Sequence, residues 1–382
     1  MESLSKEDLV GLVQSVFPRF PEDRRLAVLA DIPRRAASDN AEWKNRRRLA
    51  EDWAGLLSEG ADIIPLEGVS LIAYPDVGSS NADLPPTVFL MNGALPDSAE
   101  GLAAGGREIP LAELFEANQL VLAPTEFSTT APLKNAAAQY GFRAATMPGF
   151  SEKMIPALKL DYAEVGRRTD ILKEKLDRAQ SADLLFRVDG ALEYAISFDL
   201  RFNPAHTSSG RFPLKGTAGN LPSGETYIVP FEGGPGEPSR TKGTLPVEIK
   251  GELLLYMVMD NRAVAVDAEG PAGRQEAEHL EREPAYGNMA ELGFGVLHDF
   301  GLRPIGELLL DEKLGVHVAF GRSDHFGGRI GPQDFSSPQE VVHLDRIYLQ
   351  ATQPRIVLES VTLGHERGFK ERIYDKGKYL IF

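Results

Sequence analysis

The pattern of apolar residues changes character about halfway along the chain, and this change constrains the fold more than any other feature. Before about residue 185, short apolar runs alternate with stretches of helical spacing, whereas after it apolar and polar residues alternate. The first pattern is typical of an α/β domain and the second of a strand-rich domain. A chain of 382 residues also exceeds one ordinary core. The sequence therefore predicts two domains, residues 1–185 and residues 186–382.

The first domain is predicted to begin with helices and to continue as a partly parallel sheet. The first 60 residues have helical patterns, with Ser5 as a helix cap and a second helical stretch at 41–57. The elements expected next are strands at 70–74, 87–91 and 120–124, a helix at 131–140, a strand at 142–147 and a helical region at 151–181. The order strand, helix, strand is typical of a βαβ unit, which gives parallel strands covered by helices.

The second domain is predicted to be a β-rich α+β domain with one clear helix at 274–282. Its expected strands are at 185–188, 194–202, 226–229, 253–259, 263–267, 315–320, 341–349 and 356–363. Alternation at period two along these segments is typical of strands with one buried face. The fold class is therefore an α/β domain followed by a β-rich α+β domain.

The composition disfavours several classes of protein. No apolar run approaches the roughly 18–20 residues that a membrane span needs, and the N-terminus does not have the pattern of a signal peptide. A net charge of −15 disfavours nucleic-acid binding, which requires a basic surface. The chain has no cysteine, so it has neither disulfides nor thiolate ligands. These features favour a cytoplasmic protein without membrane or nucleic-acid partners.

Two of the histidines lie in strand patterns of the second domain. His317 alternates with two valines, and His343 and Asp345 are two residues apart. Strand geometry puts the side chains of His343 and Asp345 on one face, with their bases about 6–7 Å apart. Two such side chains can converge on one cation, although a His-X-Asp sequence on a strand is also commonly a simple hydrogen-bonded pair.

Histidine and carboxylate are the ligands that suit Zn, Co, Mn or Fe when no thiolate is present. Two His and one carboxylate are also the facial triad of non-haem Fe(II) enzymes. Glu225 follows a turn at the start of a predicted strand, and Glu291 lies among small and apolar residues. A buried carboxylate needs a partner, which is a metal ion, a backbone N–H or an arginine.

Four segments of the second domain resemble the thermophilic aminopeptidase family, the metallopeptidases typified by aminopeptidase T and aminopeptidase S. In order, these segments are NLPSGETYIVP at 220–230, MAELGFG at 289–295, DEKLGVHVAFG at 311–321 and VHLD at 342–345. Both their order and their spacing fit, and the match covers about residues 215–350. The βαβ pattern of the first domain is similar to the N-terminal α/β domain of that family, more weakly.

The resemblance implies a pair of divalent metal ions (Zn, Co or Mn), with Glu291 as a bridge between them. The ligands that it implies are Glu225, Glu291, His317, His343 and Asp345. It implies further a homodimer with the site in an internal cavity, and a peptide substrate from which the N-terminal residue is hydrolysed. A carboxylate near the metals, for which Glu225 is the candidate, would take the proton of the attacking water.

The same fold occurs in a mononuclear Fe(II) ring-cleaving dioxygenase that acts on dihydroxypyridine. In that case a single Fe(II) would be bound by His317, His343 and Asp345. A third alternative is a non-catalytic peptide-binding protein of a biosynthetic pathway on the same scaffold. The presence of both glutamates favours the peptidase with two metal ions.

One segment departs from the family pattern. The peptidases have a tyrosine shortly after the His-X-Ala-X-Gly segment, whereas this chain has RSDHFGG at 322–328. Asp324 and His325 are the candidates for that place, as an extra ligand or as a general acid or base. The alternative is that this segment is a loop and that the activity has drifted or been lost.

Overall fold

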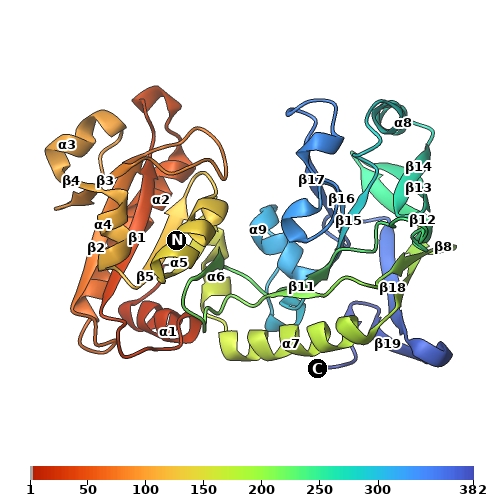
Figure 1. Ribbon diagram of the computed structural model, residues 1–382, viewed down its shortest axis with the longest axis horizontal. Helices are drawn as coiled ribbons and strands as arrows, with labels where there is room; N and C mark the ends of the chain where they lie inside the picture. The colour runs from red at the N-terminus through yellow and green to blue at the C-terminus, as the bar shows by residue number, and fades with distance from the viewer. Residues whose placement is uncertain (1–2) are drawn as a thin grey trace. The chain divides into compact units, whose positions relative to one another are not determined.

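The computed structural model describes residues 3–382. The chain forms two compact units (Figure 1). The N-terminal unit contains the chain up to Gly166 together with Ser208–Ser223, and the C-terminal unit contains Arg167–Thr207 and Gly224–Phe382. The boundary predicted near residue 185 lies inside strand β7 (Ser181–Val188) of the C-terminal unit. The chain first passes from one unit to the other within helix α7 (Tyr162–Arg178), and the predicted domain bounds stay a prediction.

The N-terminal unit is built on a seven-stranded sheet. In spatial order its strands are β10 (Thr217–Asn220), β6 (Arg143–Pro148), β5 (Leu120–Thr125), β1 (Arg25–Ile32), β2 (Gly68–Pro75), β3 (Thr87–Met91) and β4 (Gly106–Pro110). The strands from β10 to β2 are parallel to their neighbours, whereas β3 and β4 are added antiparallel. The mostly parallel, helix-covered sheet confirms the predicted α/β class.

Helices pack on the sheet because its strands are apolar on both faces. The helices of this unit are α1 (Lys6–Val16), α2 (Ala41–Glu59), α3 (Leu102–Gly105), α4 (Leu111–Ala117), α5 (Thr130–Tyr140) and α6 (Ile155–Leu158). Ala27 and Leu29 of β1 share a core with residues of α4 and α5. Helix α2 packs against β1 and β2, and its buried Trp53 stacks edge-on against Phe150.

Strand β1 corrects the expectation that the first 60 residues are helical. Seven of its eight residues are buried, and it pairs with β2 on one side and β5 on the other. A short, fully buried strand has a continuous apolar run rather than alternation, so periodicity alone does not separate it from a helix. The predicted helix at 41–57 and strands at 70–74, 87–91, 120–124 and 142–147 match α2, β2, β3, β5 and β6.

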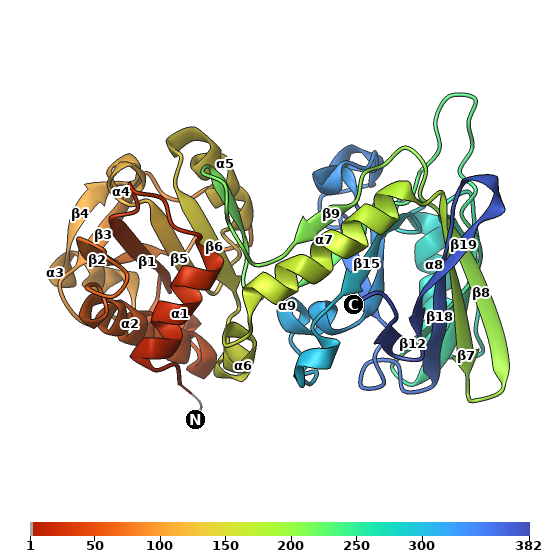
Figure 2. The ribbon, with the colours of Figure 1, turned by 90° about the horizontal axis from the view of Figure 1, so that it is seen from below.

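The C-terminal unit contains two sheets, of five and eight strands. The eight-stranded sheet has the order β14 (Arg262–Asp267), β13 (Glu252–Met259), β12 (Lys242–Ile249), β8 (Leu192–Asp199), β7, β18 (Ile356–Gly364), β19 (Lys370–Asp375) and β20 (Lys378–Tyr379). Its neighbouring strands are antiparallel, and Figure 2 shows β7, β8 and β18 side by side. These sheets confirm the predicted β-rich class.

The five-stranded sheet has the order β17 (His343–Ile347), β16 (Val316–Gly321), β15 (Met289–Gly295), β11 (Glu225–Ile228) and β9 (His206–Ser208). Strand β15 lies at its centre and is buried along its whole length. The sequence analysis predicted no strand there, although it singled out Glu291. Helix α8 (Pro271–Arg282) packs on β14 and β13, and the short helix α9 (Leu308–Asp311) precedes β16.

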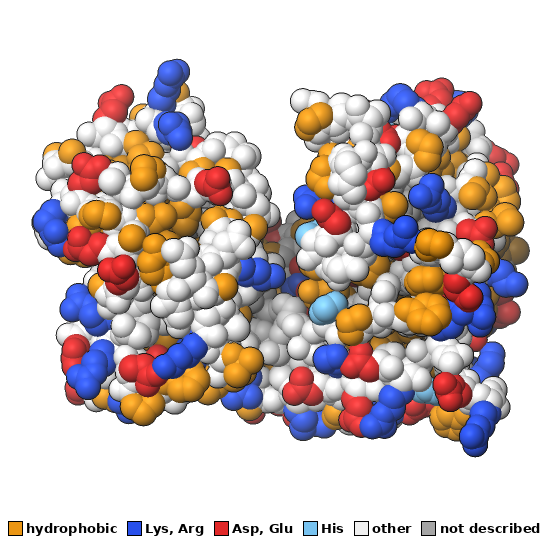
Figure 3. Space-filling model, in the orientation of Figure 1, with side chains coloured by type: hydrophobic (Ala, Val, Ile, Leu, Met, Phe, Trp, Pro, Cys, Tyr) orange, Lys and Arg blue, Asp and Glu red, His pale blue; other side chains and the backbone are white. Residues whose placement is uncertain are grey.

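Charged side chains are mixed over the surface. On the face drawn in Figure 3, Lys and Arg side chains are interspersed with Asp and Glu. Among the described residues, no helix is both long and apolar enough to cross a membrane. The absence of nucleic-acid partners and the cytoplasmic location remain predictions.

Candidate metal centre

Four neighbouring strands of the five-stranded sheet bring the predicted ligands together. Glu225 is the first residue of β11, Glu291 lies in β15, His317 in β16, and His343 and Asp345 in β17. The strands are paired in antiparallel register, with His317 opposite Gly293 and Asp345 opposite Ala319. Residues of four separate sequence segments therefore meet on one sheet, as Figure 1 shows for its strands.

Glycine at position 293 makes room for the imidazole of His317. A Cβ atom at Gly293 would lie 1.9 Å from Nε2 of His317, well inside van der Waals contact. Gly295 has a similar role, because a Cβ there would lie 2.3 Å from the carbonyl carbon of Lys313. Because neither glycine has a side chain, the imidazole of His317 and the backbone of Lys313 can lie directly against β15.

Glu225, Glu291 and His317 form a buried cluster. Their ligand atoms all lie within 4.8 Å of one another. His317 Nε2 is 3.3 Å from Oε1 of Glu291 and 3.6 Å from Oε2 of Glu225. The exposed fraction is 1% for His317, 4% for Glu291 and 7% for Glu225, so bulk water does not solvate the charges of these side chains. Such a cluster suggests a metal site.

His343 and Asp345 lie on the other side of Glu291. His343 Nε2 is 3.4 Å from Oε2 of Glu291 and 3.7 Å from Oδ1 of Asp345. Glu291 thus presents one oxygen to each histidine. The predicted placement of His343 and Asp345 on one strand face brings them to the same centre.

Backbone carbonyls orient both imidazoles. Nδ1 of His317 lies 3.3 Å from the carbonyl oxygen of Gly315, and Nδ1 of His343 lies 2.8 Å from that of Arg322. With the proton on Nδ1, each Nε2 directs its lone pair at the carboxylates, which are themselves acceptors. The lone pairs of Nε2 and of the carboxylate oxygens repel one another unless a cation or a proton lies between these atoms. A hydrogen bond from Nδ1 to a backbone carbonyl is also the usual way in which a metal-binding histidine is oriented.

The pKa values of these groups show how strongly the cluster attracts positive charge. Burial alone would lower the pKa of His317, but its hydrogen bond to Glu291 and the nearby carboxylates raise that pKa to about 10. The pKa of His343 is likewise raised against burial, to about 9, chiefly by Glu291. Although burial would raise the pKa of Glu291, the two imidazoles hold it well below its usual range. The donor set therefore fits a divalent cation, which would compete with these protons.

Two further charged residues, which the sequence analysis did not identify, belong to the centre. Glu312 and Lys313 lie in the short helix η5 (Glu312–Leu314) just before β16. The Lys313 ammonium donates hydrogen bonds to Oε1 of Glu225 and to Oε1 of Glu312. Burial and the neighbouring carboxylate of Glu225, only partly offset by Lys313, raise the pKa of Glu312 to about 7. Glu312 lies five residues before His317, next to a predicted strand, and this position is the sequence signal that could have identified it as part of the centre.

Asp324 and His325 lie in the short helix η6 (Asp324–Phe326) after β16. Arg322 donates to the carboxylate of Asp324, and this pairing lowers the pKa of Asp324 although burial opposes it. The His325 ring lies edge-on to His343, with 5.1 Å between ring centroids. Burial and the charge of His343 lower the pKa of His325 to about 4. His325 is therefore adjacent to the centre, whereas the charge of Asp324 is engaged by Arg322.

A tyrosine does lie near the centre, but it comes from another segment. Tyr227 is two residues after Glu225 on β11, and its ring packs against Phe326 at 4.8 Å. Burial, together with the charges of Glu291 and Glu225, raises the pKa of Tyr227 above its usual range. The period of two along a strand places Tyr227 on the face of Glu225, and this could have been predicted from the sequence.

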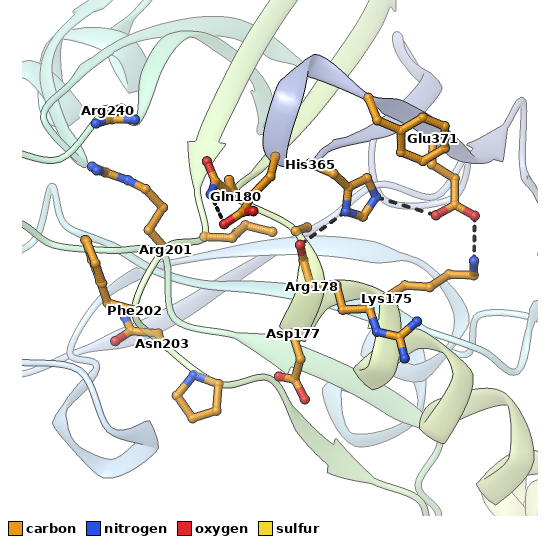
Figure 4. Close-up of a pocket in the computed structure, with 15 residues that line it drawn as sticks. Lys175, Asp177, Arg178, Gln180, Arg201, Phe202, Asn203, Arg240, His365 and Glu371 are labelled. Atoms are coloured by element: carbon orange, nitrogen blue, oxygen red, sulfur yellow. Dashed lines mark hydrogen bonds and ion pairs between the residues drawn. The ribbon is translucent and has the colours of Figure 1, made fainter.

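The C-terminal unit also has a hollow of about 1210 Å³ away from these ligands, lined by the end of α7 and by residues near β8 and β19 (Figure 4). Its charged groups pair with one another. Lys175 bonds Glu371, and His365 lies between the carbonyl oxygen of Arg178 and the carboxylate of Glu371 (Figure 4). Arg201 bonds Asp199, which lies outside the lining. These charged groups are therefore held by partners within the protein.

The fold is shared with two solved enzyme structures. The 2,5-dihydroxypyridine dioxygenase from Pseudomonas putida KT2440 matches with a TM-score of 0.58 at 15% identity, over 99% of this chain and 98% of that chain. The aminopeptidase AmpT from Thermus thermophilus matches with a TM-score of 0.56 at 15% identity, over 98% of this chain and 100% of that chain. Neither a protein-family model nor a curated protein sequence matches the chain. The predicted resemblance is confirmed at the level of the fold.

Proposed function

We propose that the chain is a metal-dependent hydrolase that removes N-terminal residues from peptides. The observation that carries this proposal is the position of Glu291, whose two oxygens face His317 and His343 respectively. Glu225 adds a carboxylate beside His317, and Asp345 adds one beside His343. A set so rich in carboxylates suits Zn, Co or Mn in hydrolytic centres.

A divalent ion held by these residues would polarise the scissile carbonyl and lower the pKa of a bound water. The chain itself supplies the proton acceptor. Oε1 of Glu225 is fixed by Lys313, while Oε2 faces His317 and the rest of the centre. Glu225 is therefore oriented to take the proton of the attacking water at Oε2.

Aromatic side chains pack together beside the centre. Phe326 packs on His343 at 5.3 Å and on Tyr227 at 4.8 Å between ring centroids. His325 lies in the same group of rings, next to His343. The imidazole of His325 is a second candidate for moving a proton to the leaving amine.

The proposal is tested with the protein loaded with Zn²⁺, Co²⁺ or Mn²⁺ and a panel of short peptides. Peptides with a free N-terminus should be cleaved after their first residue, and the same peptides with an acetylated N-terminus should not. Glu291→Gln should abolish cleavage, whereas the exposed His298 offers a matched control, since His298→Gln should leave it unchanged. Absence of cleavage by a folded, metal-loaded protein would contradict the proposal.

A mononuclear Fe(II) oxygenase is the second candidate. His317, His343 and Asp345 have the composition of a facial triad, and the fold is shared with a 2,5-dihydroxypyridine dioxygenase. In this case the Fe(II)-loaded protein would consume oxygen in the presence of 2,5-dihydroxypyridine and would leave peptides intact. Oxygen uptake and peptide cleavage measured on the same preparation separate the two functions.

A further inference from the structure

A short turn, residues 322–330, holds the imidazole of His343 from two sides. Nδ1 of His343 donates to the carbonyl oxygen of Arg322 at 2.8 Å. The rings of His325 and Phe326 pack on the imidazole, with 5.1 Å and 5.3 Å between ring centroids. His343 is the first residue of β17, the edge strand of its sheet, so no further strand supports it there. The orientation of this imidazole therefore depends on the turn.

The turn is closed by hydrogen bonds around Ser323. The backbone N–H groups of Ser323 and Asp324 donate to the carbonyl oxygen of Ile330, and that of Gly328 donates to the carbonyl oxygen of Ser323. The hydroxyl of Ser323 fills the space beside Gly328, where a Cβ atom would lie 2.2 Å from Oγ. Ser323 is fully buried, so a displacement of this residue would move the whole turn.

Glu232, from a different segment of the chain, anchors Ser323. Its Oε1 accepts hydrogen bonds from the hydroxyl of Ser323 at 2.5 Å and from Nδ2 of Asn288 at 2.7 Å. Its Oε2 accepts a hydrogen bond from the backbone N–H of Arg329. Asn288 also donates to the carbonyl oxygen of Gly321, the last residue of β16. One carboxylate thus ties both ends of the turn to the strands of the centre.

Only a carboxylate satisfies all three donors. An ionised carboxylate accepts hydrogen bonds at both oxygens, whereas an amide of the same shape would direct its own N–H at one of the donors. Ser323 and Asn288 are 0% and 1% exposed, so water does not replace the lost hydrogen bond. Glu232 lies outside the four segments that resemble the aminopeptidases, and the turn lies where the chain departs from their pattern.

We propose that Glu232 is a positioning residue of the metal centre. Through Ser323 it holds the turn 322–330, and the turn holds the imidazole of His343 in the orientation that binds the metal ion. This inference rests on the metal centre of the proposed function, and it applies to either reaction.

The first test is the imidazole proton spectrum of the full-length, metal-free protein labelled with ¹⁵N-histidine. A proton on Nδ1 of His343 that is bonded to Arg322 should exchange slowly with water and give a downfield signal. This signal is assigned by its absence in His343→Ala. Glu232→Gln should lose it, because the turn no longer holds the carbonyl of Arg322 in place. The measurement requires neither bound metal nor activity.

The second test is a Co²⁺ titration followed by visible absorption. Glu232→Gln should bind Co²⁺ about 10–100-fold more weakly than wild type, the usual loss when an outer-shell partner of a ligand is removed. In the His343→Ala background the same substitution should change the affinity by less than about twofold, because the residue through which Glu232 acts is then absent. A general loss of stability would lower the affinity equally in both backgrounds.

Glu237→Gln is the matched control. Glu237 follows Glu232 in the same loop, but it pairs with Arg201 and Arg240. This variant should keep both the signal of His343 and the affinity for Co²⁺. Ser323→Ala covers the case in which Glu232→Gln does not fold, since it removes only the hydroxyl that joins Glu232 to the turn. It should lose the same signal.

A wild type without the signal of His343 would overturn the proposal, and so would a signal that persists in folded Glu232→Gln or Ser323→Ala. An equal loss of Co²⁺ affinity with and without His343 would also overturn it. A wild type that shows the signal but binds no Co²⁺ would contradict the metal centre, and with it this role of Glu232. All results as expected but no peptide cleavage would support the role of Glu232 and contradict the peptidase alone.

Discussion

Both units bury charged side chains, but they do so in different ways. In the N-terminal unit, each buried guanidinium faces a carboxylate. Arg143 bonds Asp23, Arg47 bonds Asp39 through two nitrogens, and Arg46 bonds Glu126. In the C-terminal centre, the carboxylates of Glu225, Glu291, Glu312 and Asp345 share one lysine and two imidazoles.

This difference separates charges that only stabilise the fold from charges that require a bound cation. A closed pair is complete without any ligand, and losing one partner costs stability. The C-terminal centre has more negative charge than its own lysine compensates, so it takes up either protons or a metal ion. The following predictions test this contrast, starting with the largest expected effect.

Glu291→Gln should have the largest effect on the centre. It removes the carboxylate that faces both His317 and His343, so metal affinity should fall by more than about 100-fold. Calorimetric titration with Zn²⁺ measures this loss. Glu283→Gln is the control, because Glu283 is a buried carboxylate of the same unit that accepts hydrogen bonds from the backbone N–H and the hydroxyl of Ser336. Equal metal affinity in the two variants would contradict the claim that the charge of Glu291 binds a metal ion, unlike other buried carboxylates.

Arg143→Met should destabilise the N-terminal unit without affecting the metal. Arg143 is buried and bonds Asp23 as well as the carbonyl oxygens of Pro18 and Phe212. Breaking such a pair leaves Asp23 unpaired and should lower the free energy of unfolding by about 3–5 kcal/mol. Denaturant unfolding measures this change.

The exposed pair of Arg24 and Glu67 provides the control. Arg24→Met should change the free energy of unfolding by less than about 1 kcal/mol. A loss of metal binding in Arg143→Met, with the fold intact, would show that this buried ion pair of the N-terminal unit also affects the metal centre.

Asp31 is the intermediate case, because N–H groups rather than a guanidinium bond its carboxylate. Burial raises its pKa to about 6, although the N–H groups of Glu126 and Phe127, Arg46 and Trp43 oppose this. A raised carboxyl pKa means that the folded state favours the protonated form. The stability due to protonation is therefore complete below about pH 4 and is lost as the pH rises through 6.

The measurement compares wild type with Asp31→Asn, which has no charge to titrate. The free energy of unfolding of wild type, minus that of the variant, should fall by about 2 kcal/mol from pH 4 to pH 7. A difference that is constant with pH would contradict the raised pKa.

Gly293→Ala should have the smallest effect of these changes. Its Cβ would lie 1.9 Å from Nε2 of His317, so the imidazole must move and metal affinity should fall by about tenfold. Gly55→Ala in helix α2 is the control, because nothing lies within 4 Å of its added Cβ. That variant should keep its metal affinity and gain about 0.5–1 kcal/mol in unfolding free energy.

The sequence predicted the two structural classes and marked candidate ligands in the second domain, because strand periodicity and residue chemistry are local properties. It did not predict strands β1 and β15, since a fully buried strand shows no alternation. Period two did place His343 and Asp345 on one face, whereas the convergence of four segments came only from their resemblance to a known family.

The sequence analysis also did not identify Lys313 and Glu312 as part of the centre. A Glu-Lys pair before a strand is usually exposed, and its burial here depends on Gly295 of another strand. Tertiary packing, not local sequence, decides this. The same holds for His325, whose position next to His343 depends on the turn after β16.

The most direct test of the account is the metal content of the purified full-length protein after loading with Co²⁺ or Zn²⁺ and desalting, beside His343→Ala. Elemental analysis should find bound metal in wild type and little in the variant, since His343 faces both Glu291 and Asp345. A wild type without metal, or equal metal in the two proteins, would contradict the claim that this cluster is a metal centre.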